Sequence, residues 1–228
     1  MLAELRARTD HAVPLRLVCQ ACVRLLPIDG ASASMMTGTA ERTMLYASDD
    51  VVAHIEALQF SLGEGPCVEA FETRRPVLVP DLAAAPAQSW PVFAEEMIGQ
   101  PVNAIFAFPL QSGAISLGAM DLYRHRTGWF SQEELAIALA LVDVAAMALL
   151  SLQLGEPPEG GIGAEQWGMY GDRAVVHQAS GMLIAALGLS PEQALSRLRG
   201  YAFATGRMVD AVARDIVARD LSPTELDR

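Results

Sequence analysis

The sequence predicts an α+β chain in two parts, an antiparallel sheet with packed helices followed by a C-terminal three-helix bundle. In the first 150 residues, strand patterns alternate with helical patterns. A Gly- and Pro-rich stretch at residues 155–163 then has the composition of a linker. The residues after it carry only helical patterns. At 228 residues the chain is long enough for two small domains.

In the first part, apolar residues at helical spacing alternate with short strand-like segments. Ser112-Gly113 lies between two such segments and favours a hairpin. Ser131 followed by Glu134 has the pattern of a capping box and begins a long helix. The expected helices are residues 13–26, 51–59 (helix or structured loop), 68–73, 91–98 and 131–152; the expected strands are residues 31–36, 43–48, 77–80, 104–111 and 114–123, with a turn at 63–66.

Three helices are expected in the second part. The first begins at Asp172 as N-cap and ends at about Leu187, before Gly188. The second begins at Ser190, where Gln193 completes a capping box, and ends at Gly206; the third begins at about Arg207. Each apolar stripe is too short to be stable alone, so the helices must pack together. The expected inward residues are Val175, Ala179, Met182, Leu183 and Ala186; Ala194, Leu195, Leu198, Tyr201 and Ala202; and Met208, Val209, Val212, Ala213, Ile216 and Val217.

Charge is distributed unevenly. The net charge of −11 argues against a nucleic-acid binder. Residues 173–207, however, contain four arginines against the single acid Glu192, a local balance of about +3. All sixteen basic residues are arginine, which excludes P-loop NTPases, Schiff-base enzymes and kinase cores because these need a lysine.

The longest apolar run, residues 135–150, has Asp143 at its centre and is shorter than the ~20 residues that cross a bilayer. No signal-peptide pattern opens the chain. We therefore expect a cytoplasmic protein without membrane association. Because this helix is apolar nearly all round, we expect one side to pack on the sheet and the other on a second copy, giving a homodimer through residues 131–152.

No catalytic or metal-binding constellation is visible. Cys19 and Cys22 share a helical stripe with leucines and fit core packing better than a metal site, because no second ligand pair completes one. Cys67 precedes a helix, where a thiol can be reactive, but a small buried cysteine is the favoured reading. The four histidines are scattered. We expect no metal, haem or covalent chromophore and no cofactor.

Four motifs in order, "SLGEGPCVEAFETRRPVLVPDL", "WPVFAEEM", "AIFAFPLQSGAISLGAMDLYRH" and "FSQEELAIALALV", resemble a GAF domain over residues 10–152. The resemblance implies an antiparallel sheet with helices on one face and a ligand-sized cavity on the other. Such a domain senses a small molecule or only mediates dimers. The alternative for the cavity residues is that they simply fill the core. The tentative cavity residues are Ser34, Met36, Phe60, Cys67, Trp90, Phe93, Phe106, Phe108 and Met120.

The C-terminal segment resembles an ANTAR RNA-binding antiterminator domain. The matching residues are Arg173, Gln178-Ala179-x-Gly181, Glu192 with Ala194, Leu198-Arg199, Ala202, and Asp210 with Ala213. The resemblance implies dimers that bind two paired RNA hairpins. The family usually has a lysine where this chain has Ser180. The expected RNA-binding residues are Arg173, His177, Gln178, Ser180, Gly181, Arg197, Arg199 and Arg207.

Together these features predict a signal-responsive transcription antitermination regulator. Its expected parts are a GAF sensor at residues 10–152, a linker at 153–171 and an ANTAR domain at 172–222. One alternative is a sensor or scaffold dimer whose bundle binds protein instead of RNA. A GAF-type enzyme such as free methionine sulfoxide reductase is disfavoured, because outside the first helix the chain has only Cys67.

Overall fold

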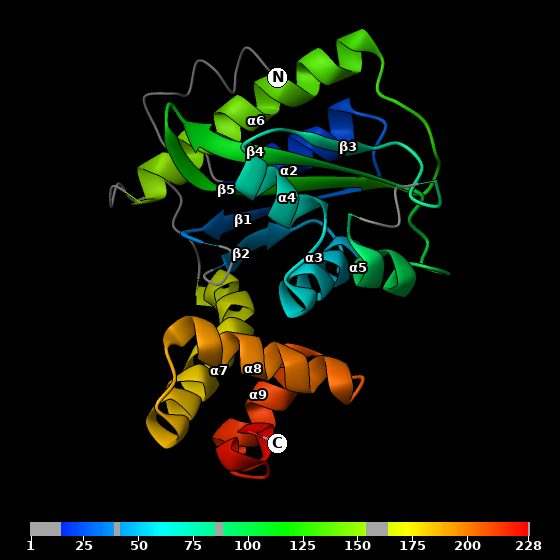
Figure 1. The fold of residues 1–228 in the computed structure, drawn as a ribbon. Coiled ribbons are helices and arrows are strands. Elements are labelled where there is room, and N and C mark those ends of the chain that lie inside the picture. The colour runs from blue at the N-terminus through cyan, green and yellow to red at the C-terminus, as the bar shows by residue number, and fades with distance from the viewer. Residues whose placement is uncertain (1–14, 39–41, 85–88, 154–163, 228) are drawn as a thin grey trace. The chain divides into compact units, whose positions relative to one another are not determined.

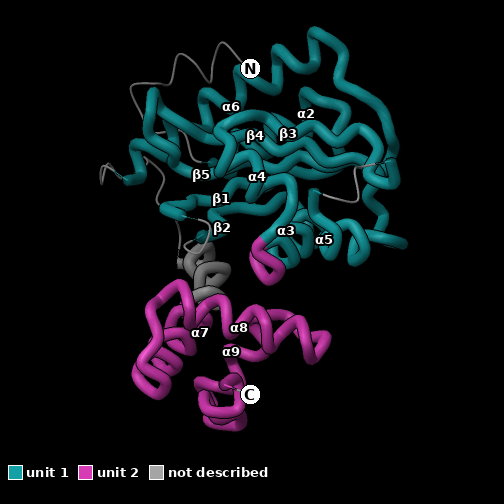
Figure 2. The backbone as a smooth tube through the Cα atoms, viewed as in Figure 1, with its two compact units in different colours: residues 1–59, 64–162 teal, residues 60–63, 163–228 magenta. Residues whose placement is uncertain are grey.

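The structure, a computed structural model, describes residues 15–38, 42–84, 89–153 and 164–227, without the side chains of residues 164–173 (Figure 1). Contacts between residues divide the chain into two compact units (Figure 2). The N-terminal unit comprises residues 1–59 and 64–162, and the C-terminal unit comprises residues 60–63 and 163–228.

Within the described residues, the N-terminal unit contains an antiparallel five-stranded sheet in the order β2-β1-β5-β4-β3. This confirms the predicted fold class. β4 and β5 form the expected hairpin, and Gly113 in its turn has a φ of 58°, which glycine adopts without strain. The strands are β1 (Gly30–Met36), β2 (Arg42–Ala47), β3 (Val77–Val79), β4 (Ala104–Ser112) and β5 (Ile115–Arg124).

One face of the sheet packs against α2 (Leu15–Leu25) and α6 (Gln132–Gln153) in a single hydrophobic core. Cys19 and Cys22 are buried in this core, as expected, and burial raises the pKa of the Cys22 thiol to about 12. The core also contains strand residues whose side chains alternate to this face, among them Ala31 and Ala33.

The opposite face is also covered by helices, α3 (Asp50–Leu62) and α4 (Pro66–Thr73). The expectation of helices on one face only was therefore wrong. The physical reason is that α3 is tied to the sheet by buried polar side chains: Glu56 accepts hydrogen bonds from β1, and Gln59 donates one to β5. Beyond them, α5 (Pro91–Glu96) is capped by Glu64, which accepts the backbone N–H groups of Val92 and Phe93 at 2.8 Å.

α6 is the long helix expected at residues 131–152. Ser131 and Glu134 form its capping box, with hydrogen bonds of 3.1 and 2.7 Å. By length and composition this helix could cross a membrane, and its buried residues pack on the sheet. Leu139 and Met147, 42 and 51% exposed, lie one turn on either side of exposed Asp143.

In the C-terminal unit, α7 (Ala164–Leu187), α8 (Pro191–Ala204) and α9 (Val209–Ala218) pack on one another, as predicted, with a 3-10 helix η1 (Pro223–Asp227) beside them. The predicted capping box at Ser190 is present. α7 begins well before the predicted N-cap Asp172, because a local capping pattern does not prevent a helix from continuing upstream. Its buried residues are Val176, Ala179 and Leu183, so Val175 and Ala186 do not form the inward face as predicted.

Candidate functional site

An exposed face of α7 carries several of the expected RNA-binding residues. His177, Gln178 and Gly181 are exposed and, at helical spacing, lie on one side of the helix. A Cβ atom added to Gly181 would meet nothing within 4 Å, so this face is open within the unit. Ser180 is half-buried. Arg173 lies in α7, but its side chain is outside the described part of the chain.

The arginines of α8 and of the turn after it are engaged in contacts within the unit. Nη1 of Arg197 lies 2.9 Å from a carboxylate oxygen of Asp227 and donates to the carbonyl oxygen of Leu226 at 3.1 Å. Nη2 of Arg207 lies 2.6 Å from Asp215. These contacts direct the two arginines to different elements, η1 and α9. The convergence of Arg173, Arg197, Arg199 and Arg207 on one RNA loop therefore stays a prediction.

One exposed aromatic residue of the bundle was not among the residues predicted to bind RNA. Phe203 on α8 is 63% exposed, a large exposure for a phenylalanine. It lies outside the inward stripe that includes Leu195, Leu198 and Ala202. The helical spacing could have indicated this exposure, because an apolar residue outside the packed stripe is expected to face solvent.

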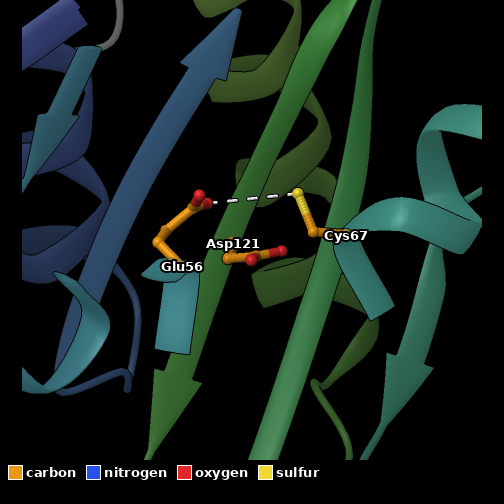
Figure 3. Close-up of side chains that lie close together, drawn as sticks. All are labelled: Glu56, Cys67 and Asp121. Atoms are coloured by element: carbon orange, nitrogen blue, oxygen red, sulfur yellow. Dashed lines mark hydrogen bonds between the residues drawn. The ribbon is translucent and has the colours of Figure 1, made fainter. Parts of the chain in front are cut away.

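A buried polar cluster lies between the sheet and helices α3 and α4 of the N-terminal unit. Glu56 on α3 accepts hydrogen bonds from the hydroxyls of Ser32 (3.1 Å) and Ser34 (2.8 Å) on β1. Gln59, one turn later, donates to Asp121 on β5 (2.6 Å) and accepts the backbone N–H of Cys67 on α4 (2.7 Å). Figure 3 shows Glu56, Cys67 and Asp121 approaching one another from three different elements. All these side chains are buried.

Arg42 supplies the positive charge of this cluster from the first residue of β2. Its Nη2 atom pairs with the carboxylate of Glu56, lies 3.0 Å from Sγ of Cys67, and lies 4.0 Å from Asp121. Within the described residues, Oδ1 of Asp121 is buried and has no hydrogen-bond partner. Burying a carboxylate oxygen without a hydrogen bond costs free energy of folding. This oxygen therefore marks the cluster as a candidate site.

Burial and charge shift the pKa values of the cluster in a consistent pattern. Burial, followed by repulsion from Glu56, raises the pKa of Asp121 to about 7, although Arg42 opposes the shift. Burial raises the pKa of the Cys67 thiol well above its usual range, again against Arg42. Burial lowers the pKa of Arg42, but Cys67, Glu56 and Asp121 outweigh it and raise the pKa overall. At neutral pH, Cys67 is therefore a thiol, and Arg42 is charged.

The structure divides the tentative cavity residues between the two sheet faces. Ser34, Met36 and Cys67 lie on the face covered by α3 and α4, where Met36 and Cys67 pack with Ala119. Phe106, Phe108 and Met120 lie in the hydrophobic core with α2 and α6, because strand residues two apart share a face and neighbours do not. A single cavity lined by both groups is therefore a wrong prediction. Trp90 and Phe93 are buried at the start of α5, and Phe60 is buried near the end of α3.

Sequence reasoning also missed Arg42, Glu56, Gln59 and Asp121. A partial signal existed: Ser32 and Ser34 are small polar residues two apart on one face of an otherwise apolar strand, and Glu56 and Gln59 share one face of a largely apolar helix. The pairing across β1, α3, α4 and β5 joins residues far apart in the chain, so the pattern could not show that they meet.

Comparisons with known proteins agree with this architecture. A model of the GAF domain matches residues 10–150, and a model of the ANTAR domain matches residues 171–217. Among solved structures, the GAF domain of an Acinetobacter phosphoenolpyruvate-protein phosphotransferase is 11% identical, with a TM-score of 0.51 over 71% of this chain and 95% of that one. The corresponding GAF domain from Coxiella burnetii is 18% identical, with a TM-score of 0.49 over 68% and 94%. No curated protein matches the chain.

The GAF match covers more than half of the sequence, and the observed sheet, its helices and the separate C-terminal bundle agree with the two matched segments. GAF domains sense signals, and ANTAR domains bind RNA in transcription antitermination. The chain therefore belongs to the GAF family, and its GAF domain is followed by an ANTAR domain in a regulatory, non-catalytic architecture.

Proposed function

We propose that this protein is a cytoplasmic transcription antitermination regulator that binds a two-hairpin RNA as a homodimer and responds to a signal at its GAF domain. The observation that carries the proposal is the ANTAR match over residues 171–217, together with the open face of α7 formed by His177, Gln178 and Gly181. Single-stranded loops are read by hydrogen bonds and stacking on such a face more than by charge alone.

The RNA contact is expected to depend less on charge than the sequence suggests. Arg197 and Arg207 are partly neutralised by Asp227 and Asp215, and Ser180 stands where the family usually has a lysine. Fewer free cations release fewer counterions, so the salt dependence of RNA binding should be shallow. A shallow dependence is compatible with specific binding when bases are contacted directly.

Phe203 is the residue that we assign to base stacking. An exposed phenylalanine on a domain that binds RNA loops offers a flat apolar surface for an unstacked base. Phe203→Ala should weaken RNA binding by about 1–3 kcal/mol, whereas Phe203→Trp should preserve it. Equal binding by all three proteins would remove Phe203 from the RNA surface.

The dimer is assigned to α6. Leu139 and Met147 flank Asp143 on an exposed stripe of this helix, which a second copy of the chain would cover. Ala145 and Leu149 are fully buried within the unit, so they belong to its own core and are not contacts of the dimer.

The decisive test of RNA binding compares a two-hairpin RNA with each hairpin alone, using the purified full-length protein. We expect the two-hairpin RNA to bind more tightly than either hairpin. Equal affinity for all three would contradict the dimeric reading. No binding to any of them, even at low salt, would favour the alternative that the bundle binds protein, which the paired state of Arg197 and Arg207 also supports.

A further inference from the structure

The buried cluster of the GAF domain contains the donor set of a metal site. The side chains of Glu56, Cys67 and Asp121 each offer one ligand atom, and these three atoms lie within 4.8 Å of one another. They come from three different elements, α3, α4 and β5 (Figure 3). A tetrahedral zinc ion, with bonds of about 2.0–2.3 Å, would bring its ligand atoms to roughly 3.5 Å from one another. The donors therefore need to move only on the order of 1 Å.

Hydrogen bonds from neighbouring residues hold the two carboxylates and the backbone of Cys67 in place. Ser32 and Ser34 donate to the carboxylate of Glu56, and Gln59 bridges the side chain of Asp121 and the backbone N–H of Cys67. Outer hydrogen bonds of this kind fix ligand orientation in metal sites.

A second observation points to a missing partner. Oδ1 of Asp121 is buried without a hydrogen bond of normal geometry from the described residues, Oδ2 of the same group is held by Gln59, and the Cys67 thiol also interacts with this carboxyl group. A coordinated cation would satisfy this oxygen. Figure 3 shows the Asp121 carboxylate lying between the side chains of Glu56 and Cys67.

Arg42 explains how the cluster remains folded without such an ion. Its Nη2 atom contacts Glu56 and Cys67 and faces Asp121, and so it lies where a bound cation would lie. A metal ion must displace this guanidinium. Arg42 is the first residue of β2, which is an edge strand of the sheet. Displacing its side chain would therefore act on the start of this strand.

We propose that Glu56, Cys67 and Asp121 bind a thiophilic divalent cation of the zinc type, in competition with the guanidinium of Arg42. One thiolate and two carboxylates suit Zn²⁺ or Co²⁺ better than Mg²⁺ or Ca²⁺, which prefer oxygen alone. A metal-bound cysteine is a thiolate, so coordination releases the proton of the Cys67 thiol. The expectation from sequence, that this domain binds no metal, is replaced by this proposal.

The role of such an ion as the GAF signal rests on the proposed sensor function, but the binding test does not. Full-length protein, purified free of metal, is titrated with Co²⁺ alone and followed by absorption. We expect one cobalt per chain and a thiolate-to-cobalt charge-transfer band in the near ultraviolet. Cys67→Ser should abolish the band, and the Cys19→Ser/Cys22→Ser double variant, altered only on the other sheet face, should retain it.

Two further variants keep the test decisive if Cys67→Ser does not fold. Asp121→Asn retains an oxygen for Gln59 but removes an anionic donor, and should weaken Co²⁺ binding roughly tenfold or more. Arg42→Met removes the competitor and should bind Co²⁺ more tightly than the native protein. No charge-transfer band in the native protein, or a band unchanged in both Cys67→Ser and Asp121→Asn, would overturn the proposal and leave a purely structural ion-pair network. Failure of RNA binding would not affect this result.

Discussion

Removal of the Glu56 side chain is predicted to be one of the most damaging single changes in the GAF domain. Glu56 is fully buried, pairs with Arg42, and accepts two serine hydroxyls. Glu56→Ala would leave a buried guanidinium without this carboxylate and two hydroxyls without their acceptor. Breaking a buried ion pair by removing one partner costs about 3–5 kcal/mol. We expect a loss of this size in the free energy of unfolding.

The assay is urea denaturation of the metal-free protein, with His54→Ala as the matched control. His54 lies two residues earlier on the same helix and is exposed, so its replacement should change stability by less than about 0.5 kcal/mol. The double variant Arg42→Met/Glu56→Leu replaces the pair by apolar side chains and should be less destabilised than Glu56→Ala. If Glu56→Ala unfolds at the same urea concentration as His54→Ala, or the double variant is the least stable of the three, the reasoning about this cluster is refuted.

Three other predictions concern the α6 interface, the α8 cap and Arg207. Leu139→Asp and Met147→Asp should convert a dimer to a folded monomer in light scattering, whereas Ala145→Glu should unfold the domain; a native monomer at micromolar concentration would contradict the α6 interface. Ser190→Ala should destabilise the bundle by about 1 kcal/mol through loss of the capping box, while exposed Ser196→Ala on the same helix should not. Asp215→Asn should free Arg207 and strengthen RNA binding, and Arg207→Ala should weaken it and reduce the salt slope by about one; if neither variant changes affinity, Arg207 has a structural role only.

Local patterns in the sequence were sufficient for most of the fold. The hairpin at Ser112-Gly113 and the capping boxes at Ser131 and Ser190 were predictable because turn and cap geometry depend on a few adjacent residues. The start of α7 was not, because a cap pattern at Asp172 carries no information about the residues before it.

The sites were harder to predict than the elements. Which strand residues face α3 depends on the alternation of side chains along each strand. The prediction placed Phe106, Phe108 and Met120 on the same sheet face as Ser34, whereas they face α2 and α6. Likewise, the sequence identified Arg207 as a candidate RNA-binding residue, but its pairing with Asp215 on α9 became visible only in the packed bundle. Composition gave a local positive charge without showing that neighbouring acids reduce it.

Transcription through a terminator tests the central claim most directly. A template carries a two-hairpin leader before an intrinsic terminator, and purified polymerase transcribes it with and without the full-length protein. We predict that the protein increases the fraction of readthrough transcript, and that disrupting either hairpin loop, or changing Phe203 to Ala, reduces the effect. Readthrough that is unchanged by the protein over a concentration range in which it binds the leader RNA would contradict its assignment as an antitermination regulator.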